Sequence, residues 1–201
     1  MESKPVRIRE AAREDVPAML EIYAPYVRDT AISFEYAVPT QEEFSARIAR
    51  IQSTYPCLVA ESEGRILGYA YCVAFIGRAA YQWSVETTIY VDRACRGRGA
   101  GGALYRALEM CLRAMNIQNM NACIGWTDAP DEHLNNDSTA FHEHMGFTLV
   151  GRFHHSGCKF GRWYDMIWME KLIGEHSTPV QPVRPFPEVR QSVDLTEFSK
   201  E

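Results

Sequence analysis

A run of β-forming residues that passes through a glycine-rich loop into a helix constrains this chain more than any other feature. The run from Val85 to Val91 predicts a strand, and apolar residues then recur at helical spacing from Leu104 to Met115. Glycines between a strand and a helix leave the first N–H groups of the helix unpaired and uncrowded, and the helix dipole adds partial positive charge there. The stretch therefore predicts an anion site, most simply for a diphosphate.

Two phosphate-binding motifs overlap in this loop. One is G-x-G-x-x-G, beginning at Gly97, which in a dinucleotide-binding protein is followed by an acidic residue that ends the next strand. That strand, expected at 119–124, has none, and Asp128 lies beyond it in a turn-like segment. The other is R-x-x-G-x-G, from Arg96 to Gly101, which resembles the acetyl-CoA signature of the GCN5-related N-acetyltransferases (GNAT). The flanking sequence has to decide between the two.

Composition limits the classes of protein to consider. The chain has 201 residues, of which 46% are hydrophobic, and this suits one sizeable core. A net charge of −5 argues against non-specific nucleic-acid binding, although Arg93, Arg96 and Arg98 form a local basic patch. No apolar run approaches the roughly 20 residues of a membrane span, and no leader precedes the first expected strand. We expect a cytoplasmic protein with neither nucleic-acid nor membrane partners.

The cysteines and histidines do not suggest a metal site. Six cysteines occur without a C-x-x-C pair, which is typical of reduced, mostly buried thiols. The pairs His142-x-His144 and His154-His155 lack the three- or four-residue spacing that directs two imidazoles at one ion. We therefore predict no metal.

Periodicity predicts an α/β (or α+β layer) fold with about seven strands in one mixed sheet and helices on both faces. Thr40 and Glu43 form a capping box for one of the helices, and Glu63-Gly64-Arg65 is expected to be a hairpin turn. The expected strands are 6–9, 57–61, 66–75, 85–91, 119–124, 147 onward and 163–172, and the expected helices follow 16–27, 40–51, 100–115 and 138–145.

The last part of the chain differs in kind. We assign residues 1–173 to a single domain and residues 174–201 to a tail, in which four prolines recur among polar residues between Pro179 and Pro187. Proline removes backbone donors, so we expect no regular element there and favour a flexible extension over an arm that docks on a partner.

A second block supports the GNAT resemblance. The pattern N-x-x-S-x-x-F-H-E-x-x-G-F, from Asn135 to Phe147, is similar to the family block in which an asparagine meets the pantetheine arm and a helix side chain reaches the CoA sulfur. Many members have tyrosine where this chain has His142, whereas the phosphinothricin and methionine-sulfone branch has histidine. The stretches 32–35, 78–86 and 157–165 also resemble that branch, and the likeness runs from about Val6 to Leu172.

The resemblance implies the chemistry of acetyl transfer from a thioester to an amine. Glu86 is the expected general base, and His142 is expected to give a proton or hydrogen bond to the departing thiolate. If the strands splay, backbone N–H groups at 89–91 would bind the thioester oxygen. The residues expected to bind acetyl-CoA are Ile89, Tyr90, Val91, Arg96, Gly97, Arg98, Gly99, Ala100, Gly101, Gly102, Asn135 and Ser138.

An acceptor site is predicted from cationic and aromatic residues. Arg78 offers a planar fork that suits a carboxylate, and Lys159 either assists it or lies at a turn. We therefore favour an acceptor that bears a carboxylate over a polyamine. The expected walls are Phe34, Tyr81, Trp83 and Trp163.

The interpretation is an acetyl-CoA-dependent N-acetyltransferase acting on the α-amino group of a small amino acid or analogue by direct attack in a ternary complex. The resemblance implies acceptors of the phosphinothricin, methionine sulfone or methionine sulfoximine type, and it favours a homodimer. Two alternatives stay open: an NAD(P)-dependent oxidoreductase, and a non-catalytic CoA-binding module.

Overall fold

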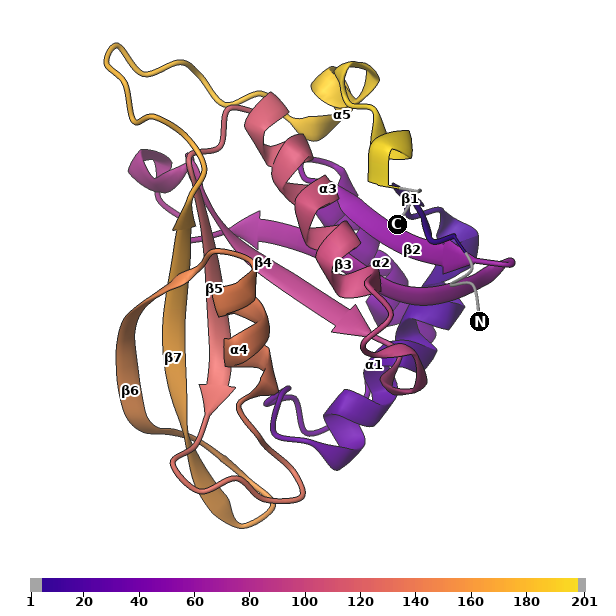
Figure 1. The fold of residues 1–201 in the computed structure, drawn as a ribbon, viewed down its shortest axis with the longest axis vertical. Coiled ribbons are helices and arrows are strands. Elements are labelled where there is room, and N and C mark those ends of the chain that lie inside the picture. Colours follow the sequence, from indigo (N-terminus) through magenta and orange to yellow (C-terminus); the bar gives the residue numbers. More distant parts are fainter. Residues whose placement is uncertain (1–4, 199–201) are drawn as a thin grey trace.

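The computed structural model describes residues 5–198, and within them one mixed sheet organises the chain (Figure 1). The strands are ordered β1-β2-β3-β4-β5-β7-β6, and every neighbouring pair is antiparallel except β4–β5. This confirms the predicted mixed sheet of about seven strands. The strands are β1 (Arg7–Glu10), β2 (Cys57–Ser62), β3 (Arg65–Ala74), β4 (Ser84–Val91), β5 (Asn119–Trp126), β6 (Thr148–Lys159) and β7 (Arg162–Leu172).

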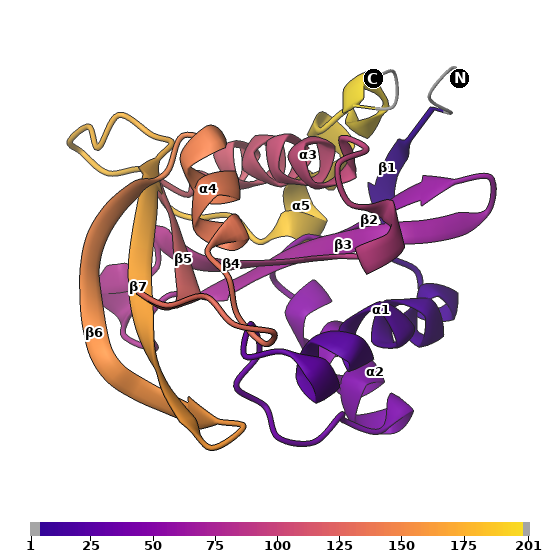
Figure 2. The ribbon, with the colours of Figure 1, turned by 60° about the horizontal axis from the view of Figure 1, so that its bottom comes forward.

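Helices cover both faces of the sheet, as predicted (Figure 2). Helices α1 and α2 lie on one face, and α3 and α4 lie on the other. The predicted capping box is present, because the N–H of Glu43 donates to the Thr40 hydroxyl and the N–H of Thr40 donates to the Glu43 carboxylate. The helices are α1 (Val16–Asp29), α2 (Gln41–Gln52), α3 (Ala100–Ala114), α4 (Asp137–His144) and α5 (Phe186–Val189), with 3₁₀ turns at Arg13–Asp15, Ala79–Tyr81, Arg93–Cys95, Arg190–Ser192 and Leu195–Phe198.

Each face of the sheet has its own apolar core. On the α3 face, Leu104, Leu108 and Leu112 are fully buried, as their spacing on one helical stripe requires. On the α1–α2 face, Phe44 and Tyr69 are buried in a second cluster. The two cores hold the sheet rigid from both sides and so fix the positions of its central strands.

The central parallel pair separates part-way along its length. Strands β4 and β5 pair at three positions, which end at Glu86 and Asn121, and β4 then continues to Val91 without a partner in β5 (Figure 1). The other neighbour, β3, stays paired with β4 as far as Val91. The opening between the two strands, which we call the wedge, exposes one side of the β4 backbone.

Between residues 174 and 198 the tail packs on the domain and contains the short helix α5, so the prediction that it has no regular element is wrong; residues 199–201 lie outside the described part of the chain. Phe186 and Val189 are each 3% exposed and join the α3-side core. The N–H of Arg184 donates to the Met115 carbonyl at 3.0 Å, and the N–H of Phe186 donates to the Thr54 carbonyl at 2.8 Å. Apolar residues between the prolines supply enough buried surface to order a segment that the prolines keep out of the sheet.

The six cysteines are free thiols in the structure. Four are buried, as the sequence predicts, whereas Cys123 is exposed and Cys158 is partly exposed. In the part of the chain that the structure describes, no helix is long and apolar enough to cross a bilayer.

Candidate active site

A cavity of about 620 Å³ lies between the end of β4 and the first turns of α3 and α4. Eleven of the twelve residues predicted to bind the cofactor line it, and the exception is Tyr90, whose side chain lies on the opposite face of β4. We call this space the cofactor cavity. The predicted residues that line it are Ile89, Val91, Arg96, Gly97, Arg98, Gly99, Ala100, Gly101, Gly102, Asn135 and Ser138.

The start of α3 forms the floor of the cofactor cavity. Gly99 is the N-cap and has a φ of +82°, which residues other than glycine rarely adopt. The N–H of Ala103 makes the first helical hydrogen bond, to the Gly99 carbonyl, so the three preceding N–H groups have no acceptor within the helix. These N–H groups and the helix dipole make an anion site.

A glycine also lets α3 and α4 approach closely beside this anion site. A Cβ atom added to Gly101 would lie 3.3 Å from the Phe141 ring and 3.6 Å from Val91. A larger side chain would therefore push on both walls of the cavity. The glycines of the loop serve a close backbone approach as well as a turn.

An arginine of the loop is held at the mouth of the cofactor cavity. The Arg96 guanidinium lies 5.4 Å above the centre of the Tyr26 ring and donates to the Tyr26 hydroxyl at 3.1 Å. A cation fixed in this way beside unpaired N–H groups strengthens an anion site. The groups lining the cavity suit a diphosphate with an attached thioester arm.

A second cavity of about 400 Å³ adjoins the first through the wedge. Ile32, Ile89 and Ser138 line both cavities and mark the place where they meet. Glu86 and His142, the two predicted catalytic residues, both line the second cavity. We call it the acceptor cavity.

Glu86 is suited to accept a proton. It is half-buried on β4, and burial raises its pKa above that of an ordinary glutamate. Within residues 5–198, its carboxylate makes no hydrogen bond or ion pair, so both oxygens remain available to a ligand. A raised pKa brings a carboxylate closer to that of a general base at neutral pH.

His142 is engaged at both ring nitrogens. Its Nδ1 donates to the Ser138 carbonyl at 2.7 Å, because a carbonyl can only accept, and its Nε2 lies 2.8 Å from the Tyr105 hydroxyl. Burial lowers the pKa of His142, which favours the neutral ring. In that state Nε2 accepts the proton of the Tyr105 hydroxyl.

The Tyr105 hydroxyl continues a chain of polar contacts to the sheet. It lies 3.2 Å from the Thr87 hydroxyl, which donates to the Asn121 carbonyl at 3.0 Å. Burial raises the pKa of Tyr105 well above its usual value, so the phenol stays protonated. His142 and Tyr105 therefore form one hydrogen-bonded unit that links α4 and α3 to Thr87 on β4.

The structure does not bring the six predicted acceptor residues together in one cavity. Only Phe34 lines the acceptor cavity. Arg78, Tyr81 and Trp163 are exposed and line neither cavity. The Trp83 indole donates to the carbonyl of Gln181 in the tail at 2.8 Å.

Lys159 lies away from both cavities, although it is only 4% exposed. Its ammonium group donates to three main-chain carbonyls, those of Val27, Thr30 and Ser33. The sequence indicated a cation beside the acceptor, but the structure places this cation beneath the segment that carries Phe34.

Several residues of the acceptor cavity were missed from the sequence. Tyr105 could have been found, because it follows Leu104 within a buried helical stripe and a buried phenol needs a hydrogen-bond partner. Thr87, Thr88 and Cys123 carry no such signal, since hydroxyls and thiols are ordinary strand residues. The missed residues that line the cavity are Tyr23, Ile32, Ser33, Glu35, Thr87, Thr88, Tyr105, Ala122, Cys123, Ile124, Gly125 and Met166.

Comparison with known proteins decides the family. The model of the acetyltransferase (GNAT) domain matches residues 8–168 of this chain. The chain belongs to the GNAT acetyltransferase family. As a GNAT protein it is an acyltransferase, and this confirms the acetyltransferase interpretation over the dinucleotide-binding alternative.

Named relatives come from the branch that the sequence resembled. The chain is 33% identical over 188 residues to the phosphinothricin N-acetyltransferase of Streptomyces viridochromogenes, covering 94% of this chain and 98% of the relative. It is 32% identical to the L-methionine sulfoximine/L-methionine sulfone acetyltransferase of Salmonella typhimurium, covering 86% and 97%. Because the first match leaves out only a twentieth of this chain, it also extends into the tail.

A solved GNAT structure shares the fold. The phosphinothricin acetyltransferase of Sinorhizobium meliloti, in complex with AcCoA, superposes with a TM-score of 0.79 at 31% identity, covering 90% of this chain and 98% of that one. The predicted single GNAT-like sheet with helices on both faces is thereby confirmed.

Proposed function

We propose that this acyltransferase moves the acetyl group of acetyl-CoA to the α-amino group of a small amino acid or analogue, of the phosphinothricin, methionine sulfone or methionine sulfoximine type. The observation that carries the proposal is the meeting of two cavities at the wedge, with an anion site on one side and the available carboxylate of Glu86 on the other. The names of the relatives support the acceptor class.

Acetyl-CoA would bind through its diphosphate at the start of α3. The unpaired N–H groups at 100–102 and the fixed Arg96 suit the charge of the diphosphate, and the open space beside Gly97 and Gly99 suits a close approach. The arm would then run between α3 and α4 along Asn135 and Ser138 toward the wedge. There the unpaired side of β4 supports hydrogen bonding to the thioester oxygen.

Glu86 would take the proton that the acceptor ammonium must lose before it attacks. The amine nitrogen then forms a bond to the thioester carbon, the C–S bond breaks, and the electron pair goes to sulfur. The nitrogen loses one further proton as the amide forms, and the thiolate takes up one proton to leave as the thiol. The two cavities adjoin directly, which supports attack within a ternary complex without an acyl-enzyme. No cysteine lines the place where they meet, among the described residues.

The His142–Tyr105 pair would stabilise the departing thiolate. In the resting protein the Tyr105 hydroxyl donates its one proton to His142 Nε2, and rotation of the O–H bond would direct that proton to the departing sulfur instead. We assign to His142 the role of positioning the Tyr105 hydroxyl through Nε2, while Nδ1 stays bonded to the Ser138 carbonyl. This refines the role that the sequence suggested for His142.

Among the described residues, none that lines the acceptor cavity offers a free cation to the acceptor's carboxylate. Glu35, which lines the cavity, is paired with Arg47 at 2.9 Å, and Lys159 is held by carbonyls. If Arg78 binds the carboxylate, as the sequence suggests, a second copy of the chain has to bring it. We therefore keep the homodimer as part of the proposal, and the exposed Leu149 and Phe153 on β6 support an interface. The free thiols support a cytoplasmic location.

Ligand binding and turnover test the proposal in two steps. Acetyl-CoA and CoA should raise the melting temperature, whereas NADH should not, because only a ligand of the folded state stabilises it. Purified protein should then release thiol from acetyl-CoA in the presence of phosphinothricin or methionine sulfone. CoA binding without thiol release across a panel of amines would instead favour the non-catalytic module.

A further inference from the structure

The β6–β7 hairpin carries a buried ammonium group with all three of its donors used. Lys159 Nζ lies 2.7 Å from the Val27 carbonyl oxygen, 2.8 Å from that of Thr30 and 2.6 Å from that of Ser33. An ammonium has three N–H donors, so this arrangement satisfies it completely. A buried charge with complete hydrogen bonding is unusual in a surface hairpin and requires an explanation.

The three carbonyls belong to one connected segment. Val27 lies in the last turn of α1, where carbonyls have no partner in the helix and the dipole is negative, and Thr30 and Ser33 follow in the loop after it. One cation therefore joins the end of α1 to the next turn of the chain. We call residues 30–36 the acceptor loop, because Ser33, Phe34 and Glu35 line the acceptor cavity.

Two neighbours of Lys159 on β6 hold the same loop. A Cβ atom on Gly157 would lie 2.6 Å from the Phe34 ring, so the ring packs directly on the β6 backbone. The carbonyl of Cys158 accepts a hydrogen bond from the Tyr36 hydroxyl. Gly157, Cys158 and Lys159, three consecutive residues of β6, thus all contact the acceptor loop.

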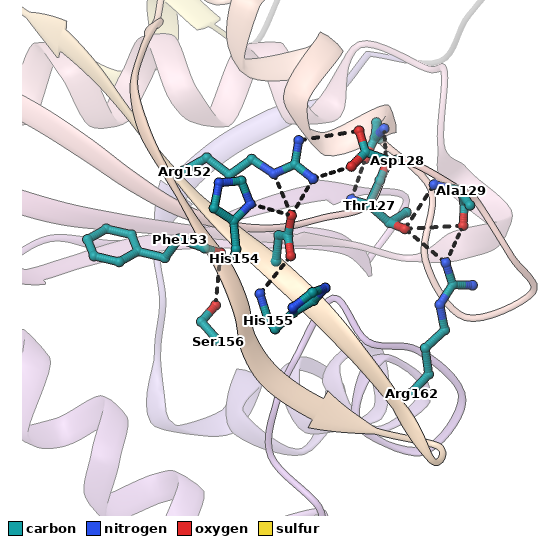
Figure 3. A network of polar contacts seen from close by, with 11 residues as sticks. Thr127, Asp128, Ala129, Arg152, Phe153, His154, His155, Ser156 and Arg162 are labelled. Atoms are coloured by element: carbon teal, nitrogen blue, oxygen red, sulfur yellow. Dashed lines mark hydrogen bonds and ion pairs between the residues drawn. The ribbon is translucent and has the colours of Figure 1, made fainter.

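The hairpin itself is braced against the loop that follows β5 (Figure 3). Arg152 bridges Asp128 and Asp165, and the second oxygen of Asp165 accepts the N–H of His155, where β6 bulges. Arg162 donates to the carbonyl of Ala129 at 2.7 Å. Charged hydrogen bonds on both strands therefore fix the position of the hairpin that carries Lys159.

We propose that Lys159 is a positioning residue of the acceptor site, which holds the acceptor loop so that Phe34 forms a wall of the acceptor cavity. The proposal rests on the proposed function in so far as this cavity receives the amine. It assigns a structural purpose to the pattern Gly157-x-Lys159-x-Gly161: glycine for the Phe34 ring, lysine for the loop carbonyls, and a glycine with a φ of +71° for the hairpin turn.

Two variants and a matched control test the proposal. Lys159→Met removes the three hydrogen bonds, and Gly157→Ala displaces the Phe34 ring while Lys159 stays. Lys171→Met removes the same charge from the same hairpin, where Nζ contacts Glu109 at 2.6 Å and neither cavity. Should Lys159→Met fail to fold, Lys159→Gln, which keeps two donors, takes its place.

Hydrogen exchange is the first readout and does not depend on activity. Amides at 30–36 should exchange at least about tenfold faster in Lys159→Met than in the wild type, with no such change in Lys171→Met. Steady-state kinetics is the second. Both test variants should raise the KM of the acceptor by about tenfold and leave the KM of acetyl-CoA within about twofold.

The outcomes separate the two proposals. Unchanged exchange in the acceptor loop, or an equal rise in both KM values, would overturn the positioning role. A wild-type protein that acetylates no amine would remove the proposed function, and the exchange comparison would still decide whether Lys159 holds the loop.

Discussion

The cofactor cavity and the acceptor cavity share three residues and one wedge, yet they are built in different ways. The cofactor cavity takes most of its lining from one continuous loop and helix start, residues 95–102, and from α4. The acceptor cavity draws its lining from seven parts of the chain: α1, the acceptor loop, β4, α3, β5, α4 and β7. The first is a backbone site encoded locally, and the second is a side-chain site that exists only after folding.

This difference predicts, for a given substitution, whether the binding of acetyl-CoA or that of the acceptor should change. Changes in the loop before α3 should alter acetyl-CoA binding alone, because the loop contributes nothing to the acceptor cavity. Changes on β4 or α3 that face the acceptor cavity should alter acceptor binding or the chemical step. Four variants test this separation.

Glu86→Gln should have the largest effect. We expect kcat to fall by about 10²-fold or more, because a positioned base is lost, while the KM of acetyl-CoA stays the same. The measurement is initial rate against both substrates at neutral pH. A rate equal to that of the wild type would remove Glu86 from the mechanism.

The pH profile sharpens the test of Glu86. Activity needs the deprotonated carboxylate, and burial raises its pKa, so kcat/KM should fall on acidification at a higher pH than for an exposed glutamate. Glu86→Gln has no titrating group at this position and should lose that acidic limb. A limb that persists in the variant would assign it to another group.

Gly99→Ala should weaken the cofactor half alone. A Cβ at a φ of +82° costs about 1–2 kcal/mol, which corresponds to about 5- to 30-fold in affinity if the loop has to keep its shape to bind. Isothermal titration with acetyl-CoA measures this change, and acceptor KM is the internal control. A comparable loss for the acceptor would contradict the separation of the two cavities.

Arg78→Ala tests whether a second copy completes the acceptor half. In the proposed dimer we expect the acceptor KM to rise by about tenfold, since a charged hydrogen bond is lost, with no change for acetyl-CoA. Mixing this variant with Glu86→Gln should restore part of the activity, because one site of the mixed dimer keeps both residues. Wild-type acceptor KM in Arg78→Ala would exclude the residue from binding.

Tyr105→Phe should have the smallest effect. It removes one hydroxyl from the chain between His142 and Thr87, and a net hydrogen bond of about 0.5–1.5 kcal/mol corresponds to about 2- to 12-fold in kcat. Binding of both substrates should not change. If His142→Gln and the double variant lower kcat to the same level, the two residues act as one unit.

Eleven of the twelve residues predicted from the sequence to bind the cofactor line one cavity, for a physical reason. A diphosphate site needs glycines, a helix start and a cation within seven residues, and all of these are visible from Arg96 to Gly102. The order of helices and strands along the chain followed in the same way from periodicity. Local spacing was sufficient because the groups that bind are main-chain N–H groups.

The acceptor half and the tail could not be predicted to the same extent. Arg78 and Lys159 are both cations near aromatic residues in the sequence, and only the folded chain shows that one is exposed and the other is enclosed by carbonyls. In the tail, Phe186 packs into the α3-side core, and its contacts are with residues that are distant in sequence. Both cases concern side chains whose partners are set by tertiary packing.

The wedge between β4 and β5 also has a kinetic consequence. If coenzyme A and the amine bind as proposed, each would occupy its own cavity, and among the described residues the two cavities have only Ile32, Ile89 and Ser138 in common. Spent coenzyme is then free to leave before or after the amide, and double-reciprocal plots should intersect whichever substrate is varied. We therefore expect either substrate to bind first.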